Sequence, residues 1–287
     1  MTVNVIPAAE AIARLADFSA VIDARSQAEY AEDRLPGALN WPTLDNDERH
    51  RIGTIFTQAS PFEAKKRGAA LAAANIARHI ERELIDTPKG WQPLVYCWRG
   101  GKRSGSLALV LDQIGFRVSL IDGGYKAFRT AVLADLPRQA VRHQYRVVCG
   151  PTGSGKTRLL HALQGAGAQV LDLEDLACHR SSVLGLVPGQ AQPTQKRFDT
   201  LVWDKLRLFD SARPVYIESE SKKVGNLAVP AALIVAMRAS PCLKLELSDD
   251  ERVRLLLEDY AFFVSDPGLF CERLEALVSR QGVHRRR

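Results

Sequence analysis

The sequence lacks any uninterrupted apolar run long enough to cross a bilayer, and no basic segment leading into an apolar one follows Met1. We therefore expect a cytoplasmic protein that does not enter a membrane. Cysteine is also scarce, because the 287 residues hold five, an odd number without any C-x-x-C spacing. This scarcity argues against a disulfide framework and against a structural zinc site, so each cysteine is judged by its own surroundings.

Neither sign of charge dominates the sequence. Lys and Arg number 39 against 33 Asp and Glu, a net charge of +6. Such a mild excess suits a polyanionic partner but does not require one. The length, together with a hydrophobic content of 46%, allows two modest cores, and we expect two domains.

Short apolar runs alternate with helix-like stretches in both halves of the chain. Strands are expected at residues 20–24, 38–41, 93–97, 118–122, 146–149, 169–173, 214–218 and 242–247. Helices are expected at 62–84, 104–114 and 268–280, and after residues 155, 195 and 249. This alternation predicts an α/β fold with parallel sheets. Pro137 and the polar, basic residues around it predict a boundary between domains at 1–137 and 138–287.

Cys97 ends an apolar strand and opens a loop that runs directly into a helix. The loop contains two glycines and three cationic side chains, in the order Trp98, Arg99, Gly100, Gly101, Lys102, Arg103, Ser104. Inward-turned N–H groups, the positive end of the helix and the cations predict an anion-binding cradle. Such a field stabilises a thiolate and an anion attached to it, whether persulfide, perselenide or phosphoryl group.

The alternative for Cys97 is a small, buried hydrophobic residue at a strand end. An inert core cysteine needs no anion cradle, so we predict that Cys97 is a catalytic nucleophile. The other four cysteines lack such surroundings and are predicted to be structural: Cys149, Cys178, Cys242 and Cys271.

Residues 150–157 fit the phosphate-loop pattern G-x-x-x-x-G-K-[ST] between a predicted strand and a predicted helix. The predicted phosphate ligands are Gly150, Thr152, Gly153, Ser154, Gly155, Lys156 and Thr157. This cradle recognises a di- or triphosphate and does not identify a base. The Thr157 hydroxyl can hold Mg²⁺, and Asp172 or Glu218, each at the end of an apolar run, is the candidate acid. Either acid could instead simply cap its strand.

The first half of the chain resembles the rhodanese pattern over residues 15–130. The resemblance rests on Asp23-Ala24-Arg25-Ser26, on residues 32–38 and on the Cys97 loop. It implies that Cys97 carries sulfur or selenium. Arg103 lies six positions after Cys97, so the loop also fits the C-x5-R spacing of cysteine phosphatases and arsenate reductases.

Nearly the whole chain resembles the tRNA 2-selenouridine synthase family. Besides the two loops, the similar strings are Gly53-Thr54-Ile55-Phe56, Ser60-Pro61-Phe62-Glu63-Ala64, residues 173–180, Gln192-Pro193-Thr194-Gln195 and residues 217–225. The resemblance implies a selenotransferase, with tRNA geranyltransferase activity, that replaces the sulfur of wobble 2-thiouridine. Selenophosphate would donate selenium, and geranyl diphosphate would alkylate the sulfur into a leaving group. We add the hypothesis that the phosphate loop holds geranyl diphosphate instead of a nucleoside triphosphate.

The same resemblance implies the partners. They are the anticodon stem-loop of tRNA and, transiently, a selenophosphate-producing enzyme, with no DNA and no tightly bound cofactor. Candidate tRNA contacts are Lys222, Lys223, Lys196 and Arg197, although any one basic pair is as readily a solvated surface. Family members continue through another helical region, so we expect a shortened second domain.

Two other functions share these motifs. One is a cysteine phosphatase, arsenate reductase or sulfurtransferase fused to a nucleotide-binding domain. The other is a nucleotide-switched adaptor in which both loops bind anions without turnover.

Overall fold

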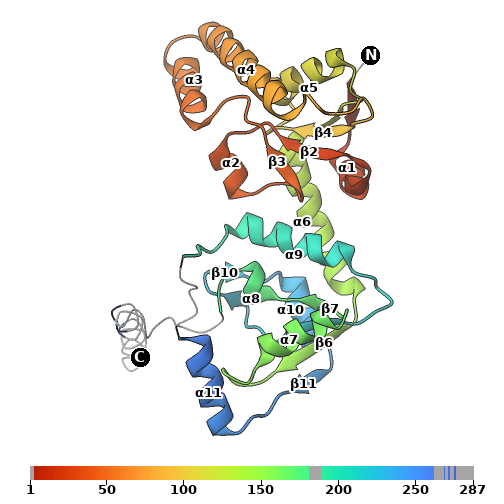
Figure 1. Ribbon diagram of the computed structural model, residues 1–287, viewed down its shortest axis with the longest axis vertical. Coiled ribbons are helices and arrows are strands. Elements are labelled where there is room, and N and C mark those ends of the chain that lie inside the picture. Colours follow the sequence, from red (N-terminus) through yellow and green to blue (C-terminus); the bar gives the residue numbers. More distant parts are fainter. Residues whose placement is uncertain (1–2, 181–188, 262–267, 269–270, 272–274, 276–287) are drawn as a thin grey trace. The chain divides into compact units, whose positions relative to one another are not determined.

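The computed structural model describes residues 3–180 and 189–261, together with 268, 271 and 275 (Figure 1). The chain divides into two compact units, Met1–Ala134 and Asp135–Arg287. Both units are α/β structures built on parallel sheets, which confirms the predicted fold class. The helix predicted at 268–280 lies almost entirely outside the described residues.

The first unit is built on a five-stranded parallel sheet in the order β1-β5-β4-β2-β3. Its strands are β1 (Asn4–Ile6), β2 (Ala20–Asp23), β3 (Ala38–Asn40), β4 (Pro93–Tyr96) and β5 (Ser119–Ile121). The helical segments are α1 (Ala8–Ala13), η1 (Leu15–Asp17), α2 (Gln27–Glu32), α3 (Asn46–Gln58), α4 (Pro61–Glu83), α5 (Lys102–Ile114) and α6 (Gly124–Arg142). Strand β4 is central and buried throughout, as its apolar run requires in a parallel sheet.

The boundary between the units does not lie in a linker. Helix α6 begins in the first unit and ends in the second, with Pro137 inside it. A proline removes one helical hydrogen bond and favours a break, which is why the sequence suggested a boundary at this position. Packing compensates here, because Leu136 and Ala140 are buried and Trp203 Nε1 donates to Asp135 Oδ2 at 2.9 Å.

The second unit contains a four-stranded parallel sheet in the order β11-β6-β8-β7. These strands are β6 (Tyr145–Cys149), β7 (Gln169–Leu171), β8 (Val215–Glu218) and β11 (Cys242–Lys244). A separate antiparallel pair is formed by β9 (Lys223–Val224) and β10 (Leu227–Ala228). The helices are α7 (Lys156–Gly165), α8 (Leu173–Leu176), α9 (Gln195–Leu208), α10 (Ala231–Arg238) and α11 (Asp249–Asp259). Because β6 and β8 are parallel neighbours, the segments that follow them meet at one edge of the sheet.

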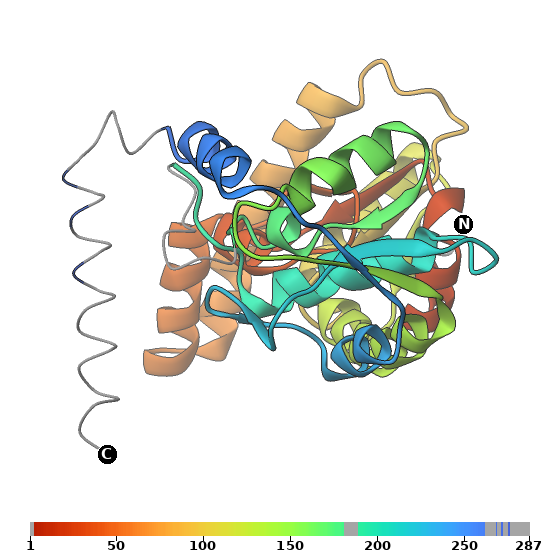
Figure 2. The same cartoon turned by 90° about the horizontal axis from the view of Figure 1, so that it is seen from below.

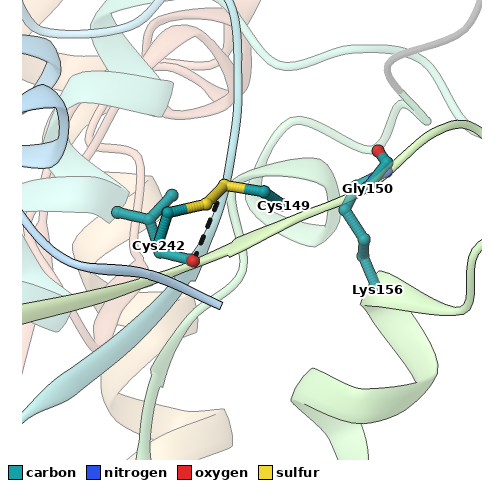
Figure 3. Close-up of a disulfide and its surroundings, with 5 residues drawn as sticks. Cys149, Gly150, Lys156 and Cys242 are labelled. Atoms are coloured by element: carbon teal, nitrogen blue, oxygen red, sulfur yellow. Dashed lines mark hydrogen bonds between the residues drawn. A yellow bond between two sulfur atoms is a disulfide. The ribbon is translucent and has the colours of Figure 1, made fainter. Parts of the chain in front are cut away.

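A disulfide joins Cys149 at the end of β6 to Cys242 at the start of β11 (Figure 3). The two Cα atoms are 6.2 Å apart, although the residues are 93 positions apart in the sequence. The sequence analysis argued against a disulfide framework and predicted both cysteines to be structural, and it missed that these two are joined. It failed because the pairing of β11 beside β6 brings them together, and no local pattern announces that pairing.

None of the described helices combines the length and the apolar character that crossing a membrane needs.

Candidate active site: a thiol loop and a phosphate loop

Cys97 lies directly after the central strand β4, where the chain leaves the core of the first unit. Only 3% of the residue is exposed. The Ser104 hydroxyl lies 3.0 Å from Cys97 Sγ and can donate to it, and the Gly101 carbonyl oxygen lies 3.9 Å from the same sulfur. The sulfur is thus packed against the core on one side, with a hydroxyl donor suited to negative charge on the other.

Two glycines leave no room for a side chain: one is in the thiol loop, and the other is in the start of α6 that contacts the loop. Gly100 has a φ of +67°, and a Cβ there would lie 2.8 Å from the Ile121 carbonyl oxygen. Gly124, at the start of α6 with a φ of +56°, leaves no room for a Cβ beside the Cys97 carbonyl oxygen. The Tyr125 N–H donates to that carbonyl at 2.8 Å. Helix α6 therefore fixes the loop by direct backbone contact.

The three cations of the thiol loop are not equivalent. Arg103 makes a two-point ion pair with Glu29, with Nη1–Oε2 at 2.6 Å and Nη2–Oε1 at 3.2 Å. Burial opposes ionisation of Glu29, but the hydrogen bond and charge of Arg103 outweigh it and lower the pKa of that carboxyl. Arg99 and Lys102 are exposed, and no side chain caps the start of α5. The cradle thus offers an anion Arg99, Lys102 and a helix N-terminus, whereas the arginine of the C-x5-R spacing is already bound.

The Asp23-Arg25 motif forms a buried support beneath the thiol loop. Arg25 is fully buried, with Nη2 2.6 Å from Asp23 Oδ2 and its guanidinium 4.1 Å from the centre of the Tyr125 ring. The ring of Trp98, in the thiol loop, stacks on the same Tyr125 ring, with 5.4 Å between the two ring centres. Burial and the neighbouring Asp33 raise the pKa of Tyr125, so the phenol stays protonated and donates to Asp33 at 2.9 Å. Trp98, which the sequence analysis placed in the thiol loop, is thus held by Tyr125, a contact that the sequence pattern did not indicate.

The predicted phosphate ligands form one continuous segment in the second unit, from the loop after β6 into the first turn of α7. Gly153 and Gly155 adopt φ values of +78° and +80°, in the left-handed region that favours glycine. The Lys156 ammonium donates to the carbonyl oxygens of Gly150 at 3.1 Å and Pro151 at 3.4 Å, so it lies over the loop (Figure 3). Ser154 is buried, and its hydroxyl has no hydrogen-bond partner within the described part of the chain.

Helix α11 packs against the phosphate loop, a contact that no sequence motif indicated. A Cβ at Gly153 would lie 2.8 Å from Leu256 Cγ. Arg252 donates to the Thr152 carbonyl at 3.3 Å, and Arg158 of α7 pairs with Glu258 at 2.8 Å. Figure 2 shows α11, in blue, beside the green helix α7. The loop is therefore shaped by α11 as well as by its own glycines.

The two candidate acids for a cation have different surroundings. Asp172 caps helix α8 by accepting from the Asp175 N–H at 2.9 Å, and its other oxygen lies 3.2 Å from His161 Nε2. Glu218 is fully buried at the end of β8. Burial, and then the charges of nearby carboxylates led by Glu174, raise the pKa of Glu218 to about 9. The structure thus gives Asp172 a capping contact and places Glu218 among other acids.

Two glutamates that the sequence analysis did not single out lie beside Glu218. Oxygen atoms of Glu174, Glu218 and Glu220 all lie within 4.8 Å of one another. The Thr157 hydroxyl of the phosphate loop is 3.4 Å from Glu174 Oε2. Such a set of oxygen donors is suited to a hard cation such as Mg²⁺.

The candidate tRNA contacts lie on two connected elements. Lys196 and Arg197 are half-buried in the first turn of α9, and Lys222 and Lys223 are exposed at β9. Gln195, next to Lys196, exchanges hydrogen bonds of 2.9 and 2.7 Å with the backbone of Ala228 in β10.

Comparisons with known proteins agree with this division. Residues 7–131 match the rhodanese-like domain family, and residues 143–270 match the tRNA 2-selenouridine synthase AAA domain. Among curated relatives, tRNA 2-selenouridine synthases from Marinobacter nauticus and Cupriavidus necator are 34% and 36% identical over 84% and 91% of this chain. The synthase from Shewanella denitrificans is 32% identical over 98% of it.

The chain spans 65%, 72% and 74% of the length of these three relatives, respectively. The similarity runs through both units and includes both loops. The chain therefore belongs to the tRNA 2-selenouridine synthase family.

Proposed function

We propose that this protein is a tRNA-modifying enzyme that converts wobble 2-thiouridine into 2-selenouridine through an S-geranylated intermediate. Its substrates would be geranyl diphosphate, selenophosphate and the anticodon stem-loop of tRNA, and its place the cytoplasm. The observation that carries the proposal is the presence, in a chain of this family, of a thiol loop at the end of β4 and a phosphate loop at the end of β6.

The phosphate loop would serve the geranylation step. The sulfur of 2-thiouridine attacks the first carbon of the geranyl group, a carbon–sulfur bond forms, and the diphosphate leaves with the electrons of the carbon–oxygen bond. Lys156 and the N–H groups of the loop would bind the diphosphate and stabilise its growing charge. Geranyl diphosphate therefore supplies both the alkyl group and the anion that fits the cradle.

A Mg²⁺ ion fits the same place. Glu218 Oε2 is buried with no hydrogen-bond partner among the described residues, and the Thr157 hydroxyl lies beside Glu174. When bound, the ion would neutralise charge on the departing diphosphate.

The thiol loop would serve the selenium step. In this route Cys97 carries the phosphoryl group, one of the anions that the loop suits, instead of the selenium that the rhodanese resemblance implies. The Cys97 thiolate attacks the phosphorus of selenophosphate, the sulfur–phosphorus bond forms, and selenium takes up a proton and leaves as hydrogen selenide with the electrons of the phosphorus–selenium bond. Hydrogen selenide then attacks C2 of the base and expels the geranyl thiolate, while water frees Cys97 as phosphate departs. Ser104, Arg99 and Lys102 are the donors and charges available to these anions. No oxidant is needed.

Basic residues of the second unit would hold the tRNA. Lys222 and Lys223 are exposed, and Lys196 and Arg197 lie on the neighbouring start of α9. Phosphate contacts of this kind weaken with rising salt concentration, which measures them collectively. A transient contact with a selenophosphate-producing enzyme would shelter the labile donor.

Mass analysis of the wobble nucleoside tests the proposal. The protein is incubated with thiolated tRNA and geranyl diphosphate, and then with selenophosphate. We expect the mass of S-geranyl-2-thiouridine first and that of 2-selenouridine second. An unchanged nucleoside, alongside turnover of an aryl phosphate or arsenate, would instead support a phosphatase or reductase.

A further inference from the structure

Helices α3 and α4 form a hairpin at the margin of the first unit, inserted in the sequence between β3 and β4 (Figure 1). The helices approach closely at Gly68 of α4, where a Cβ would lie 3.4 Å from Ile52 Cγ2 of α3. Nearer the start of α3, Asn75 Nδ2 donates to Glu48 Oε2 at 2.7 Å. No residue of α3 is buried. The hairpin is therefore a braced arm whose outer surface faces solvent.

Positive charge is concentrated around the turn of this hairpin. Residues 51–67 hold four cationic side chains and one carboxylate, a net charge of +3 in 17 residues of a chain whose total is +6. All four cations are exposed: Arg51, Lys65, Lys66 and Arg67. The single carboxylate, Glu63, is shared by Lys66 at 2.5 Å and Arg67 at 3.7 Å. The acids in the first turn of α3 lie at its opposite end. The turn therefore attracts anions.

Two phenylalanine rings are exposed among these cations. Phe56, in the last turn of α3, is 51% exposed, and Phe62, in the first turn of α4, is 67% exposed. Lys66 Nζ lies 5.2 Å from the centre of the Phe62 ring. Cations interleaved with accessible aromatic rings suit an RNA strand, because cations contact its phosphates while the rings stack on its bases.

The arm begins beside the thiol loop. Near the start of α3, Arg49 Nε lies 3.1 Å from Glu29 Oε2, the oxygen that Arg103 of the thiol loop contacts at 2.6 Å. From there the 13 residues of α3 rise about 20 Å to the turn. Phosphates of a stacked strand are roughly 3.4 Å apart along its axis, so this distance corresponds to about six nucleotides. A strand with one base at the thiol loop can therefore reach the turn.

We propose that the turn of the α3–α4 hairpin, residues 51–67, is an RNA-binding surface that holds the tRNA strand beside the base presented to Cys97. Its cations contact phosphates, and Phe56 and Phe62 stack on unpaired bases. The inference rests on the proposed function in taking the RNA to be tRNA, and it adds a contact on the first unit. A membrane surface fits less well, because a membrane-binding helix presents a continuous apolar face, whereas Ile52 of α3 packs against α4.

Binding of an RNA stem-loop with the sequence of a tRNA anticodon arm tests the surface. Fluorescence anisotropy measures the affinity of the full chain at several salt concentrations. The triple variant Lys65→Gln, Lys66→Gln, Arg67→Gln removes three exposed charges. Each phosphate contact contributes roughly 0.7–0.9 to the slope of log affinity against log salt, so the slope should fall by about 2.

The matched control removes three exposed charges of the same unit at the far end of α4 and just beyond it: Arg78→Gln, Arg82→Gln, Lys89→Gln. It should leave the salt slope unchanged. The proposal is overturned if the first triple variant keeps the slope of the unaltered protein, or if the control lowers the slope equally. Binding of the unaltered protein to phosphatidylserine vesicles and not to the stem-loop would also overturn it.

Phe62→Ala tests stacking separately from charge. It should weaken stem-loop binding roughly tenfold and leave the salt slope unchanged, because the ring carries no charge. Ile85→Ala is the control, since Ile85 is an apolar side chain, 73% exposed, just beyond α4. Unchanged affinity in Phe62→Ala would overturn the stacking role. Circular dichroism checks that the helices of each variant remain.

Modification of full-length thiolated tRNA separates this inference from the proposed function. If the stem-loop binds as expected but no 2-selenouridine forms, the RNA-binding surface stands and the proposed function fails. If 2-selenouridine does form, the Lys65, Lys66 and Arg67 triple variant should need roughly tenfold more tRNA for a half-maximal rate. An unchanged tRNA requirement in that variant would overturn the surface while the proposed function stands.

Discussion

The thiol loop and the phosphate loop both follow a parallel strand at its carboxyl end, yet the charged groups around them are balanced in opposite ways. In the first unit the buried Arg25 pairs with Asp23, and the buried Glu29 pairs with Arg103. In the second unit the buried Glu218 faces other carboxylates. The pKa of Glu29 is lowered by its cation, whereas that of Glu218 is raised by burial and its acidic neighbours. The buried charges beside the thiol loop are therefore paired within the fold, whereas Glu218 beside the phosphate loop has no cationic partner among the described residues.

The largest effect that would separate the two loops is expected from Cys97→Ser. A serine hydroxyl is a far weaker nucleophile than a thiolate, so selenium incorporation should fall on the order of a thousandfold while geranylation persists. Mass analysis of the nucleoside after each step measures both. Cys178→Ser, at a free cysteine of the second unit, should leave both steps intact. Equal loss of both steps in Cys97→Ser would show that the thiol loop does not act separately.

Lys156→Ala should produce the complementary defect. Removing the ammonium takes away one preorganised charge at the leaving diphosphate, and geranylation should fall roughly 100-fold. Binding of geranyl diphosphate, measured by calorimetry, should also be lost. Lys205→Ala, an exposed lysine of α9, serves as the control. Unchanged binding in Lys156→Ala would remove the phosphate loop from the account.

Asp23→Ala tests whether the first unit depends on its internal charge balance. Breaking a buried ion pair leaves Arg25 uncompensated, and we expect a loss of about 3–5 kcal/mol in the free energy of unfolding. Urea unfolding followed by circular dichroism measures it. Asp17→Ala removes a carboxylate from an exposed pair with Arg14 and should cost less than about 1 kcal/mol. Similar losses in the two variants would show that the first unit depends no more on its buried ion pair than on an exposed one.

The smallest effect concerns pH. The pKa of Glu29 is lower in the folded than in the unfolded protein. Its ion pair with Arg103 therefore stabilises the fold fully at pH values above the pKa that Glu29 has in the unfolded protein. That contribution is lost as pH falls through the folded pKa. Thermal unfolding between about pH 6 and pH 3 should therefore show a shallower decline for Glu29→Gln than for the unaltered protein. If the melting temperatures of the two proteins fell in parallel as the pH is lowered, the ion pair between Glu29 and Arg103 would contribute nothing to stability.

Local patterns were sufficient to predict the strand–loop–helix units of both sites. The run Pro93–Tyr96 with the loop behind it, and residues 150–157 between β6 and α7, are contiguous, so spacing and residue type reveal them. Helix α6 was hidden because tertiary packing overrides the preference of Pro137 for a break.

Contacts between distant segments could not be predicted from the sequence. The Cys149–Cys242 disulfide spans 93 positions, and the pair of Glu29 with Arg103 spans 74. The three glutamates likewise meet only because β8 ends beside α8. Each of these contacts depends on which strands pair and which helix ends lie side by side, and a single sequence does not carry that information locally.

The division of labour between the loops is tested most directly with tRNA that already carries S-geranyl-2-thiouridine. The Lys156→Ala and Cys97→Ser variants are each incubated with this substrate and selenophosphate, and the mass of the wobble nucleoside is measured by mass spectrometry. The account predicts that Lys156→Ala forms 2-selenouridine from it as the unaltered protein does, whereas Cys97→Ser leaves it geranylated. Conversion by Cys97→Ser, or failure of Lys156→Ala, would contradict separate roles for the two loops.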